Sequence, residues 1–235
     1  MFLASGICFS QMEPEQQLQQ GTAYVNGGSF QEGIDLLSQY LESNPGNPSA
    51  LYYRAKGYFG QKDLDNAMND LSSAIATNPQ FTEALDLRGM VYTEKNMLNE
   101  AVNDFTNAVN SNPEYAPAYL NRAIASRKAK QYARAVSDFD KVIALDPSLF
   151  EAYYQRGVVK LLIGSADQSL ADFNFYIENI TDRAAAYAGR GLANFQLGQY
   201  LQAAADLEQA LLFNPRLEAD FRSIIESAKT NAGGK

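Results

Sequence analysis

The sequence predicts a stacked-repeat fold, because a 34-residue segment recurs along the chain in register. Prolines mark the repeat: Pro45, Pro79, Pro113 and Pro147 stand 34 residues apart, and Pro215 stands 68 residues beyond Pro147. Self-similarity at a period of this size is typical of arrays in which each repeat contacts mainly its neighbours. With 46% hydrophobic residues, such an array can bury a long strip of core. We therefore expect one solenoid domain over residues 11–230.

Each repeat carries small and large residues at fixed places, which we number 1 to 34 from Pro48. Place 8 holds Gly21, Ala55, Gly89, Ala123, Gly157 and Gly191, and place 20 holds Gly33, Ala67, Ala101, Ala135, Ser169 and Ala203. Place 24 holds Leu37, Leu71, Phe105, Phe139, Phe173 and Leu207. Small residues let two helices approach closely, and a large residue fills the space beside them.

At these residues the chain resembles the tetratricopeptide repeat family over six repeats: 14–47, 48–81, 82–115, 116–149, 150–183 and 184–217. The resemblance implies an all-α fold, an α-α superhelix that forms a right-handed solenoid of helix-turn-helix repeats with a concave groove. It also implies a non-catalytic protein without a cofactor, since members of the family mostly bind proteins or peptides.

Helix ends are predicted from turn chemistry. Each second helix of repeats 2 to 4 should stop at Asn-Pro or Asp-Pro, because the residue before proline is pushed out of the α region. The expected helices of the first four repeats are 13–26, 29–42, 48–60, 64–77, 82–95, 98–111, 116–129 and 132–145. Apolar residues at helical spacing beyond the last repeat predict a cap helix over 218–230 and a disordered tail over 231–235.

Repeat 5 departs from the pattern. Ser169 replaces alanine, the bulky Tyr176 stands at place 27, and Thr181 replaces proline. We expect the alanines at 184–186, which open the next helix, to make room for Tyr176.

Composition argues against several classes of function. The 27 acidic and 19 basic residues give a net charge of −8, which opposes nucleic-acid binding, where Lys and Arg supply most of the affinity. Histidine is absent and Cys8 is the only cysteine, so we expect no metal site and no internal disulfide. The sequence also lacks a phosphate-binding glycine loop and a Ser/His/Asp set, so we expect no enzyme activity.

Residues 1–10 form an apolar, uncharged segment. They are too few to span a bilayer, which takes roughly 20 apolar residues, so we expect no integral membrane segment. Cys8 and Ser10 are small residues two apart, as a signal peptidase requires for cleavage before Gln11. The segment therefore resembles a truncated secretory signal, and we expect a periplasmic or secreted protein of bacterial type. A frayed apolar tail on a cytoplasmic protein is the alternative.

An arginine and an aspartate recur together in repeats 2 to 6. Place 7 holds Arg54, Arg88, Arg122, Arg156 and Arg190, and place 23 holds Asp70, Asp104, Asp138, Asp172 and Asp206. Repeat 1 has Gln20 and Leu36 there, so both charges are absent together. Pairing inside each repeat leaves no orphan charge, so we predict a structural ladder of partly buried ion pairs without a catalytic role.

Place 11 changes character along the chain, from tyrosine in repeats 1 to 3 to Ser126, Lys160 and Asn194 in repeats 4 to 6. We expect Lys160 to extend its ammonium to water along its apolar stem. A polar pocket that binds a ligand is the alternative.

The resemblance implies that the first helix of each repeat lines the groove, with places 2, 5, 9, 12 and 13 facing outward. The predicted binding residues are Tyr52, Lys56, Phe59, Asp86, Met90, Glu94, Leu120, Ile124, Arg127, Lys128, Tyr154, Val158, Leu161, Leu192 and Phe195. Many are apolar or aromatic, which is typical of an interaction surface. The alternative is that several apolar ones belong to the core between repeats.

Two functions follow from these observations. The first is a scaffold that binds a protein or peptide in its groove. The second is a structural or self-assembling protein that makes contacts through its ends or its convex face, and the oligomeric state would distinguish the two. A clamp for carboxylate-ended chaperone tails is not expected, because the repeats beside Asn121 offer the acidic Asp86 and Glu151.

Overall fold

Helices account for the regular structure of the chain. The computed structural model describes residues 12–181 and 183–233, so the predicted signal segment 1–10 lies outside the described residues. These residues form thirteen α-helices and a short 3-10 helix, η2 (Pro215–Leu217), and contain no strand. The all-α prediction is therefore confirmed. Within the described ranges, no helix combines the length and the apolar character needed to cross a membrane.

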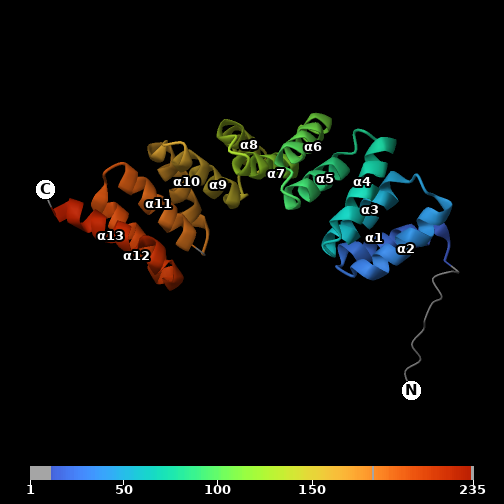
Figure 1. Cartoon of the computed structure of the whole chain (residues 1–235), viewed down its shortest axis with the longest axis horizontal. Helices are drawn as coiled ribbons and strands as arrows, with labels where there is room; N and C mark the ends of the chain where they lie inside the picture. The colour runs from blue at the N-terminus through green and yellow to red at the C-terminus, as the bar shows by residue number, and fades with distance from the viewer. Residues whose placement is uncertain (1–11, 182, 234–235) are drawn as a thin grey trace, which may run out of the picture. The chain divides into compact units, whose positions relative to one another are not determined.

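The α-helices form one hairpin for each repeat (Figure 1). In chain order they are α1 (Pro14–Asn26), α2 (Phe30–Ser43), α3 (Pro48–Gly60), α4 (Leu64–Thr77), α5 (Thr82–Glu94), α6 (Leu98–Ser111), α7 (Ala116–Lys128), α8 (Tyr132–Leu145), α9 (Phe150–Leu162), α10 (Ala166–Asn179), α11 (Ala184–Gln196), α12 (Tyr200–Phe213) and α13 (Glu218–Gly233). Four of the eight predicted helices have the expected bounds, three differ by one residue at one end, and α2 differs by one residue at both ends.

The C-terminal helix is longer than predicted. α13 continues to Gly233, so residues 231–233 are helical where a disordered tail was expected. Residues 218–233 contain no proline that would end the helix earlier. Lys229 near its end also pairs with Glu208 of α12 at 2.6 Å, which holds this part of the helix against the last repeat.

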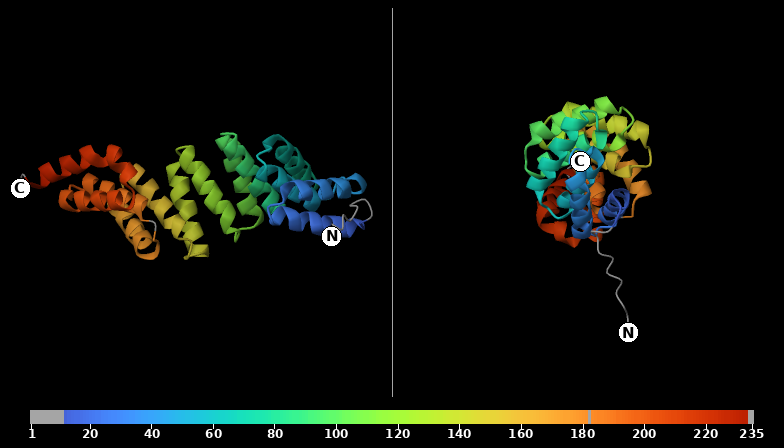
Figure 2. Two further views of the ribbon diagram at one scale, coloured as in Figure 1. Left: turned by 90° about the horizontal axis from the view of Figure 1, so that it is seen from below. Right: turned by 90° about the vertical axis from the view of Figure 1, so that its right-hand side faces the viewer.

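The helices divide into two compact parts, residues 1–121 and residues 122–235, and the division falls inside α7. Within each part, hairpins follow one another in chain order (Figure 2). In the N-terminal part α1 contacts α3 and α3 contacts α5, while in the C-terminal part α9 contacts α11. Second helices of adjacent repeats contact each other less than the first helices do. The first helices therefore form the more closely spaced layer in each part.

The turn inside each repeat has the same geometry in all six copies. The residue at place 15 has a positive φ of 58° to 84°, and it is Gly28, Lys62, Asn96, Lys130, Gly164 or Gly198. The N–H at place 16 donates to the C=O at place 11 at 2.8–2.9 Å in every repeat. This six-to-one bond with a left-handed residue is the Schellman motif, which satisfies the last carbonyls of the first helix.

The core lies between the two helices of each repeat, where the small and large residues meet as predicted. All six side chains at place 24 are buried, with Phe105, Phe139 and Phe173 the largest. A Cβ on Gly89 would lie 2.6 Å from the ring of Phe105, so this position needs glycine to admit the ring. In repeat 5, Tyr176 packs against a buried cluster that includes Ala186, as the alanine run suggested.

Candidate partner-binding surfaces

Each arginine at place 7 binds the aspartate at place 23 of its own repeat through two nitrogens. Arg54 Nε and Nη2 each lie 2.7 Å from an oxygen of Asp70. The same fork recurs at 2.5–3.1 Å in the pairs Arg88–Asp104, Arg122–Asp138, Arg156–Asp172 and Arg190–Asp206. All five aspartates are buried, and a buried carboxylate is stable only when it is paired and hydrogen-bonded.

The third nitrogen of the arginine reaches the preceding repeat at place 25. Arg156 Nη1 lies 2.6 Å from Asp140 Oδ1, and Arg54 Nη1 lies 3.2 Å from Ser38 Oγ. The arginine therefore joins adjacent repeats, a contact that the sequence pattern did not reveal. Repeat 1, with Gln20 at place 7, cannot form this joint to a further repeat.

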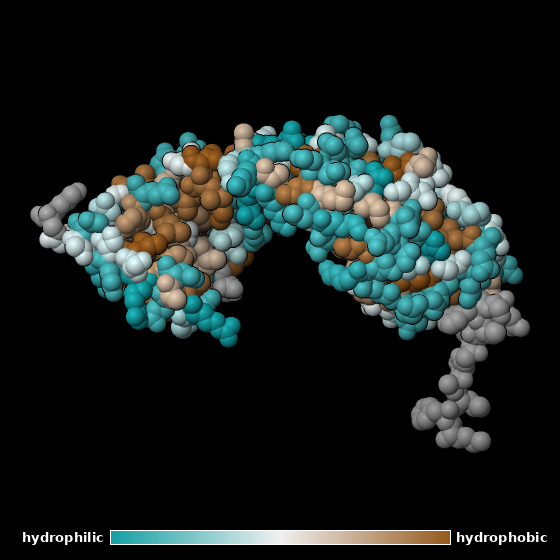
Figure 3. Space-filling model, in the orientation of Figure 1, coloured by the Kyte–Doolittle hydropathy of each residue, from teal (hydrophilic) through white to brown (hydrophobic). Residues whose placement is uncertain are grey.

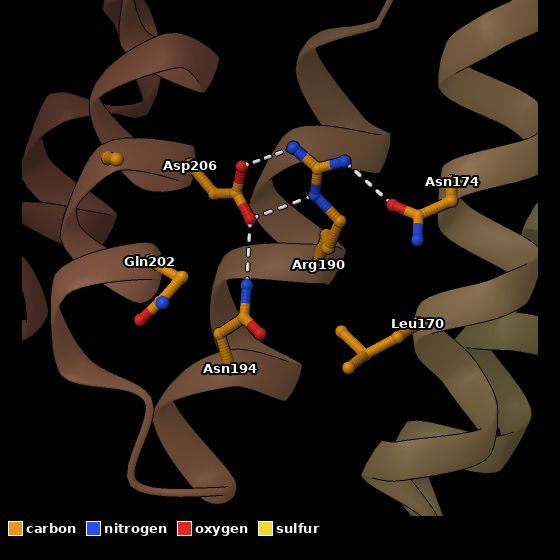
Figure 4. A pocket seen from close by; sticks show the side chains of 7 residues that line it. Leu170, Asn174, Arg190, Asn194, Gln202 and Asp206 are labelled. Carbon is orange, nitrogen blue, oxygen red and sulfur yellow. Dashed lines mark hydrogen bonds and ion pairs between the residues drawn. The ribbon is translucent and has the colours of Figure 1, made fainter.

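Place 11 supplies another group to the same carboxylate in the last two repeats. Asn194 Nδ2 lies 2.9 Å from Asp206 Oδ2 (Figure 4). Lys160 Nζ lies 2.8 Å from Asp172 Oδ2, and its side chain is only 15% exposed. The expectation that Lys160 extends to water is therefore wrong, because the buried carboxylate is close enough to bind the ammonium.

The remaining residues at place 11 have different surroundings. The guanidinium of Arg54 lies 6.0 Å from the ring centroid of Tyr58, and that of Arg88 lies 5.9 Å from Tyr92. These distances are at the outer limit of a cation–π contact. Ser126 Oγ is buried without a hydrogen-bond partner among the described residues.

A polar pocket of about 300 Å³ lies beside the last ion pair of the ladder, and its lining residues are Leu170, Asn174, Arg190, Asn194, Gln202, Ala205 and Asp206. Figure 4 labels all of them except Ala205. Arg190 Nη1 donates to Asn174 Oδ1 at 2.7 Å, and the other two groups of the rung bind Asp206. Because these groups neutralise one another, the pocket is a structural joint between repeats and a poor candidate for a ligand site.

An apolar pocket of about 460 Å³ lies in the C-terminal part between α9, α11 and the cap helix α13. Its lining residues are Tyr154, Val158, Leu161, Leu162, Ala184, Ala185, Ala188, Gly189, Leu192, Asn214, Leu217 and Phe221. Four of the predicted groove residues meet here, Tyr154, Val158, Leu161 and Leu192. Figure 3 shows apolar surface gathered over the C-terminal repeats in the same region of the chain.

The sequence did not reveal which residues leave the space of this pocket and which form its walls. Small residues of α11 leave the space, and a Cβ on Gly189 would lie 2.6 Å from the ring of Phe173. Tyr154 packs against Phe173 and Tyr176, whose ring centroids lie 6.1 and 5.3 Å from its own. Phe221 adds an aromatic wall from α13, which the sequence predicted only as a cap helix. The alanine run at 184–186 was the available signal.

The other predicted residues of the C-terminal part do not line the pocket; these are Ile124, Arg127, Lys128 and Phe195. Phe195 packs on Tyr200 at 5.5 Å, at the opposite end of α11 from Ala184. Arg127 Nε is buried without a hydrogen-bond partner among the described residues. Burial raises the pKa of Tyr154, the nearby charge of Glu151 adds to that rise, and the charge of Arg127 opposes it. One wall of the apolar pocket therefore lies near charges of both signs.

In the N-terminal part the predicted residues are spread over α3, α5 and α7: Tyr52, Lys56, Phe59, Asp86, Met90, Glu94 and Leu120. Tyr52, Phe59 and Met90 are half-buried and pack against the core cluster, as the alternative interpretation of the apolar positions allowed. Lys56 Nζ donates to Asn26 Oδ1 at 2.8 Å. These side chains do not converge on one cavity in the described residues, so their role in binding stays a prediction.

Asp86 departs most from its predicted position. It was expected to face outward, but only 6% of it is exposed. Asn121 Nδ2 donates to Asp86 Oδ1 at 2.9 Å. Burial raises the pKa of Asp86 to about 6, the hydrogen bond from Asn121 opposes the rise, and the nearby Glu83 adds to it. Burial raises the pKa of Tyr52 and Tyr115, and the charge of Asp86 adds to both rises, so groups from neighbouring segments lie near it, which a count of places along one helix cannot foresee.

Comparison with protein families settles the identity of the repeat. Profiles described as tetratricopeptide repeat match residues 18–85, 87–150 and 184–217, which is more than half of the chain. The chain belongs to the tetratricopeptide repeat family. Residues 151–183 lie outside the matched ranges, in agreement with the departures of repeat 5 at Ser169, Tyr176 and Thr181.

Solved tetratricopeptide structures resemble this chain in fold. YrrB, described as a tetratricopeptide protein with an unusual peptide-binding site, is 21% identical with a TM-score of 0.71, covering 76% of this chain and 92% of YrrB. MamA is 21% identical with a TM-score of 0.67, covering 74% and 94%. A tetratricopeptide protein from Parabacteroides merdae is 22% identical with a TM-score of 0.60, covering 96% and 86%. No curated protein matched the sequence.

Tetratricopeptide proteins are generally non-catalytic scaffolds that bind proteins or peptides, and this chain has their fold. The ladder of ion pairs joins successive tetratricopeptide repeats.

Proposed function

We propose that the protein is a non-catalytic scaffold that binds a partner polypeptide on its first-helix layer, with apolar side chains of the partner in the pocket between α9, α11 and α13. The observation that carries the proposal is the convergence of Tyr154, Leu192 and Phe221 around about 460 Å³ of apolar space. Concave apolar sites with aromatic walls are the usual places where binding energy concentrates.

The size of the pocket sets the expected affinity. A volume of this size holds one or two large side chains, and burying each such side chain contributes about 1.5–3 kcal/mol. Main-chain contacts and the ordering of a flexible peptide offset one another in part. We therefore expect affinities around micromolar, which correspond to roughly −8 kcal/mol.

The test begins with a random dodecapeptide library on phage, selected against the full chain. The binding of the selected peptides is then measured by fluorescence anisotropy for the wild type, Ala185→Glu and Ala171→Glu. Ala185 is exposed and lines the pocket, so glutamate there places a carboxylate in apolar space. Ala171 is exposed on α10, so it receives the same change away from the pocket.

The proposal predicts selected peptides rich in Leu, Phe or Tyr, with roughly tenfold weaker binding to Ala185→Glu and unchanged binding to Ala171→Glu. A selection that yields no binding peptide would contradict the proposal. So would selected peptides whose binding is weakened by Ala171→Glu and not by Ala185→Glu. Circular dichroism checks that both variants keep the helical spectrum.

A second function, self-assembly, is favoured by a different surface. Leu201 and Leu212 of α12 are 71% and 74% exposed, and Phe213 is half exposed at the end of the same helix. Exposed apolar side chains gathered on one second helix are typical of a contact between proteins. Analytical ultracentrifugation of the wild type and of Leu201→Glu/Leu212→Glu tests this function: a dimer that dissociates in the variant supports it, and a wild-type monomer at 100-fold different concentrations contradicts it.

A further inference from the structure

Six aspartates are buried in the described residues, and one of them differs from the rest. Asp70, Asp104, Asp138, Asp172 and Asp206 each receive a forked arginine. Asp86 is equally buried, but in the described part of the chain its side chain receives only the amide of Asn121 and no cation. A carboxylate at this depth normally has a charged partner. The sixth aspartate therefore lacks the group that the protein supplies to the other five.

The surroundings of Asp86 come from three different segments. Tyr52 stands on α3, Glu83 lies one turn before Asp86 on α5, and Tyr115 precedes α7. Burial raises the pKa of Tyr52 to about 12, with Glu83 and Asp86 adding to the rise, and burial together with Asp86 raises the pKa of Tyr115. Two aromatic hydroxyls and two carboxylates therefore influence one another here, and in the described part of the chain the polar partner of Asp86 is the amide of Asn121.

The charge of the chain is also unevenly divided. Residues 1–121 contain 14 acidic and 5 basic residues, a net charge of −9, whereas residues 122–235 contain 13 acidic and 14 basic residues, a net charge of +1. All of the excess negative charge therefore lies in the part that holds Asp86. A field of one sign steers ligands of the opposite sign and raises their association rate.

We propose that Asp86, with Asn121, Tyr52 and Tyr115 around it, binds a lysine or arginine side chain of the partner polypeptide. The polypeptide as carrier rests on the proposed function, whereas the preference for a cation rests on this site alone. Asn121 occupies Oδ1, and Oδ2 is left to accept a hydrogen bond from the incoming cation. Tyrosine rings attract an organic cation through their faces as well. A divalent metal ion fits less well, because no group of three acidic or sulfur ligands meets in the described residues.

The first test uses single amino-acid probes and does not depend on any peptide. The side-chain amide resonance of Asn121 is followed by NMR in the full chain during titration with the N-acetyl methylamides of arginine, lysine and norleucine. The two cations are expected to shift it in a saturable way and norleucine is not. Asp86→Asn keeps the shape and the hydrogen bond from Asn121, and binding should weaken at least tenfold. Glu100→Gln removes the same charge from an exposed position on α6 and should leave the binding of the cations unchanged.

Equal binding of cations to the wild type and Asp86→Asn would overturn the inference, and so would binding of norleucine as strong as that of lysine. A response to calcium chloride without a response to the organic cations would overturn it as well.

The second test repeats the peptide selection on Asp86→Asn. Wild-type peptides should be enriched in Lys or Arg, and the variant should lose this enrichment while keeping the apolar one. If the wild type selects no peptide but the arginine probe binds at Asn121, the proposed function fails and the cation site stands. If peptides are selected without a basic residue, the proposed function stands and this inference fails.

Discussion

Asp86 destabilises the free protein at neutral pH. Its folded pKa of about 6 lies above the ordinary 3.8, so the folded state binds more protons than the unfolded state between these values. Stability from this group is therefore highest below pH 4, falls as the pH rises through 6, and reaches its minimum above that. The full difference is on the order of 2–3 kcal/mol, at 1.36 kcal/mol for each pKa unit.

The variant Asp86→Asn tests that linkage, since the amide stays neutral at every pH. We expect its free energy of unfolding in urea to exceed that of the wild type by about 1–3 kcal/mol at pH 7 and to match it near pH 4. Measuring the difference between the two proteins at pH 4, 5.5 and 7 cancels the titration of all other carboxylates. A difference that does not change with pH would show that Asp86 is not the group that titrates.

Ser126 is another residue with an unmet polar group. Its Oγ is buried without a hydrogen-bond partner among the described residues, whereas Ser169 Oγ is buried and donates to the carbonyl of Ala166 at 2.7 Å. Alanine is the better helix former at both positions. We expect Ser126→Ala to be more stable than Ser169→Ala by about 1 kcal/mol, the net value of one hydrogen bond. Chemical denaturation of both variants measures this, and the reverse order would refute it.

At the residue scale, the sequence predicts those contacts whose residue types recur at the same place in each repeat. The pairing of Arg122 with Asp138 followed from the joint absence of both charges in repeat 1. The joint from Arg156 to Asp140 did not, because place 25 carries serine, threonine, aspartate or asparagine in successive repeats and shows no pattern. The binding of Lys160 to Asp172 depends on which direction a long side chain takes, and spacing along the chain does not determine that.

At the scale of elements, the turn inside each repeat stores strain in three of six copies. Lys62, Asn96 and Lys130 adopt the left-handed conformation, which costs a non-glycine residue roughly 1 kcal/mol. We expect Lys130→Gly to raise the free energy of unfolding by about 1 kcal/mol and Gly198→Ala to lower it by a similar amount. Thermal unfolding of both variants measures this, and a loss of stability in Lys130→Gly would show that its side chain makes a contact worth more than the strain.

Helix bounds were predictable because the signals for them are local. α4 and α6 each end two residues before a proline. The small residues at places 8 and 20 determine how closely the two helices of a repeat pack. The pocket around Tyr154 was not predictable as a cavity, because its space arises from Gly189 and Phe221 on elements that are distant in sequence. The end of α13 was misjudged for a related reason: Lys229 and Glu208 hold it through a contact across helices.

At the scale of the whole molecule, the ladder makes the energetics local. Four arginines bind both their own repeat and the one before it, namely Arg54, Arg88, Arg156 and Arg190, as in a one-dimensional array whose stability is a sum over neighbours. We expect Arg54→Met to reduce hydrogen-exchange protection in α1 to α4 and to leave residues 150–217 unchanged. Arg190→Met should do the reverse, with losses in α10 to α13.

Exchange measured by mass spectrometry on peptides from each repeat decides the matter. Removing one partner of a buried pair costs on the order of 2–4 kcal/mol here, since the arginines are partly exposed, so the local effect is large enough to see. A uniform loss of protection along the chain in either variant would show one cooperative structure instead of a chain of coupled repeats.

The joint between repeats also gives the array a direction, with consequences for how such a chain can lengthen. Repeats 2, 3, 5 and 6 each bring an arginine that bonds an acceptor at place 25 of the repeat before. The last acceptor, Glu208, is taken by Lys229 of the cap, while repeat 1 has no arginine to offer. A duplicated copy of an internal repeat inserted in frame would find both of its joints ready. A copy fused before repeat 1 or after α13 would find neither. A repeat duplicated inside the array therefore finds partners on both sides, whereas a repeat added at either end does not. The number of repeats can change in this way without altering the first repeat or the cap helix.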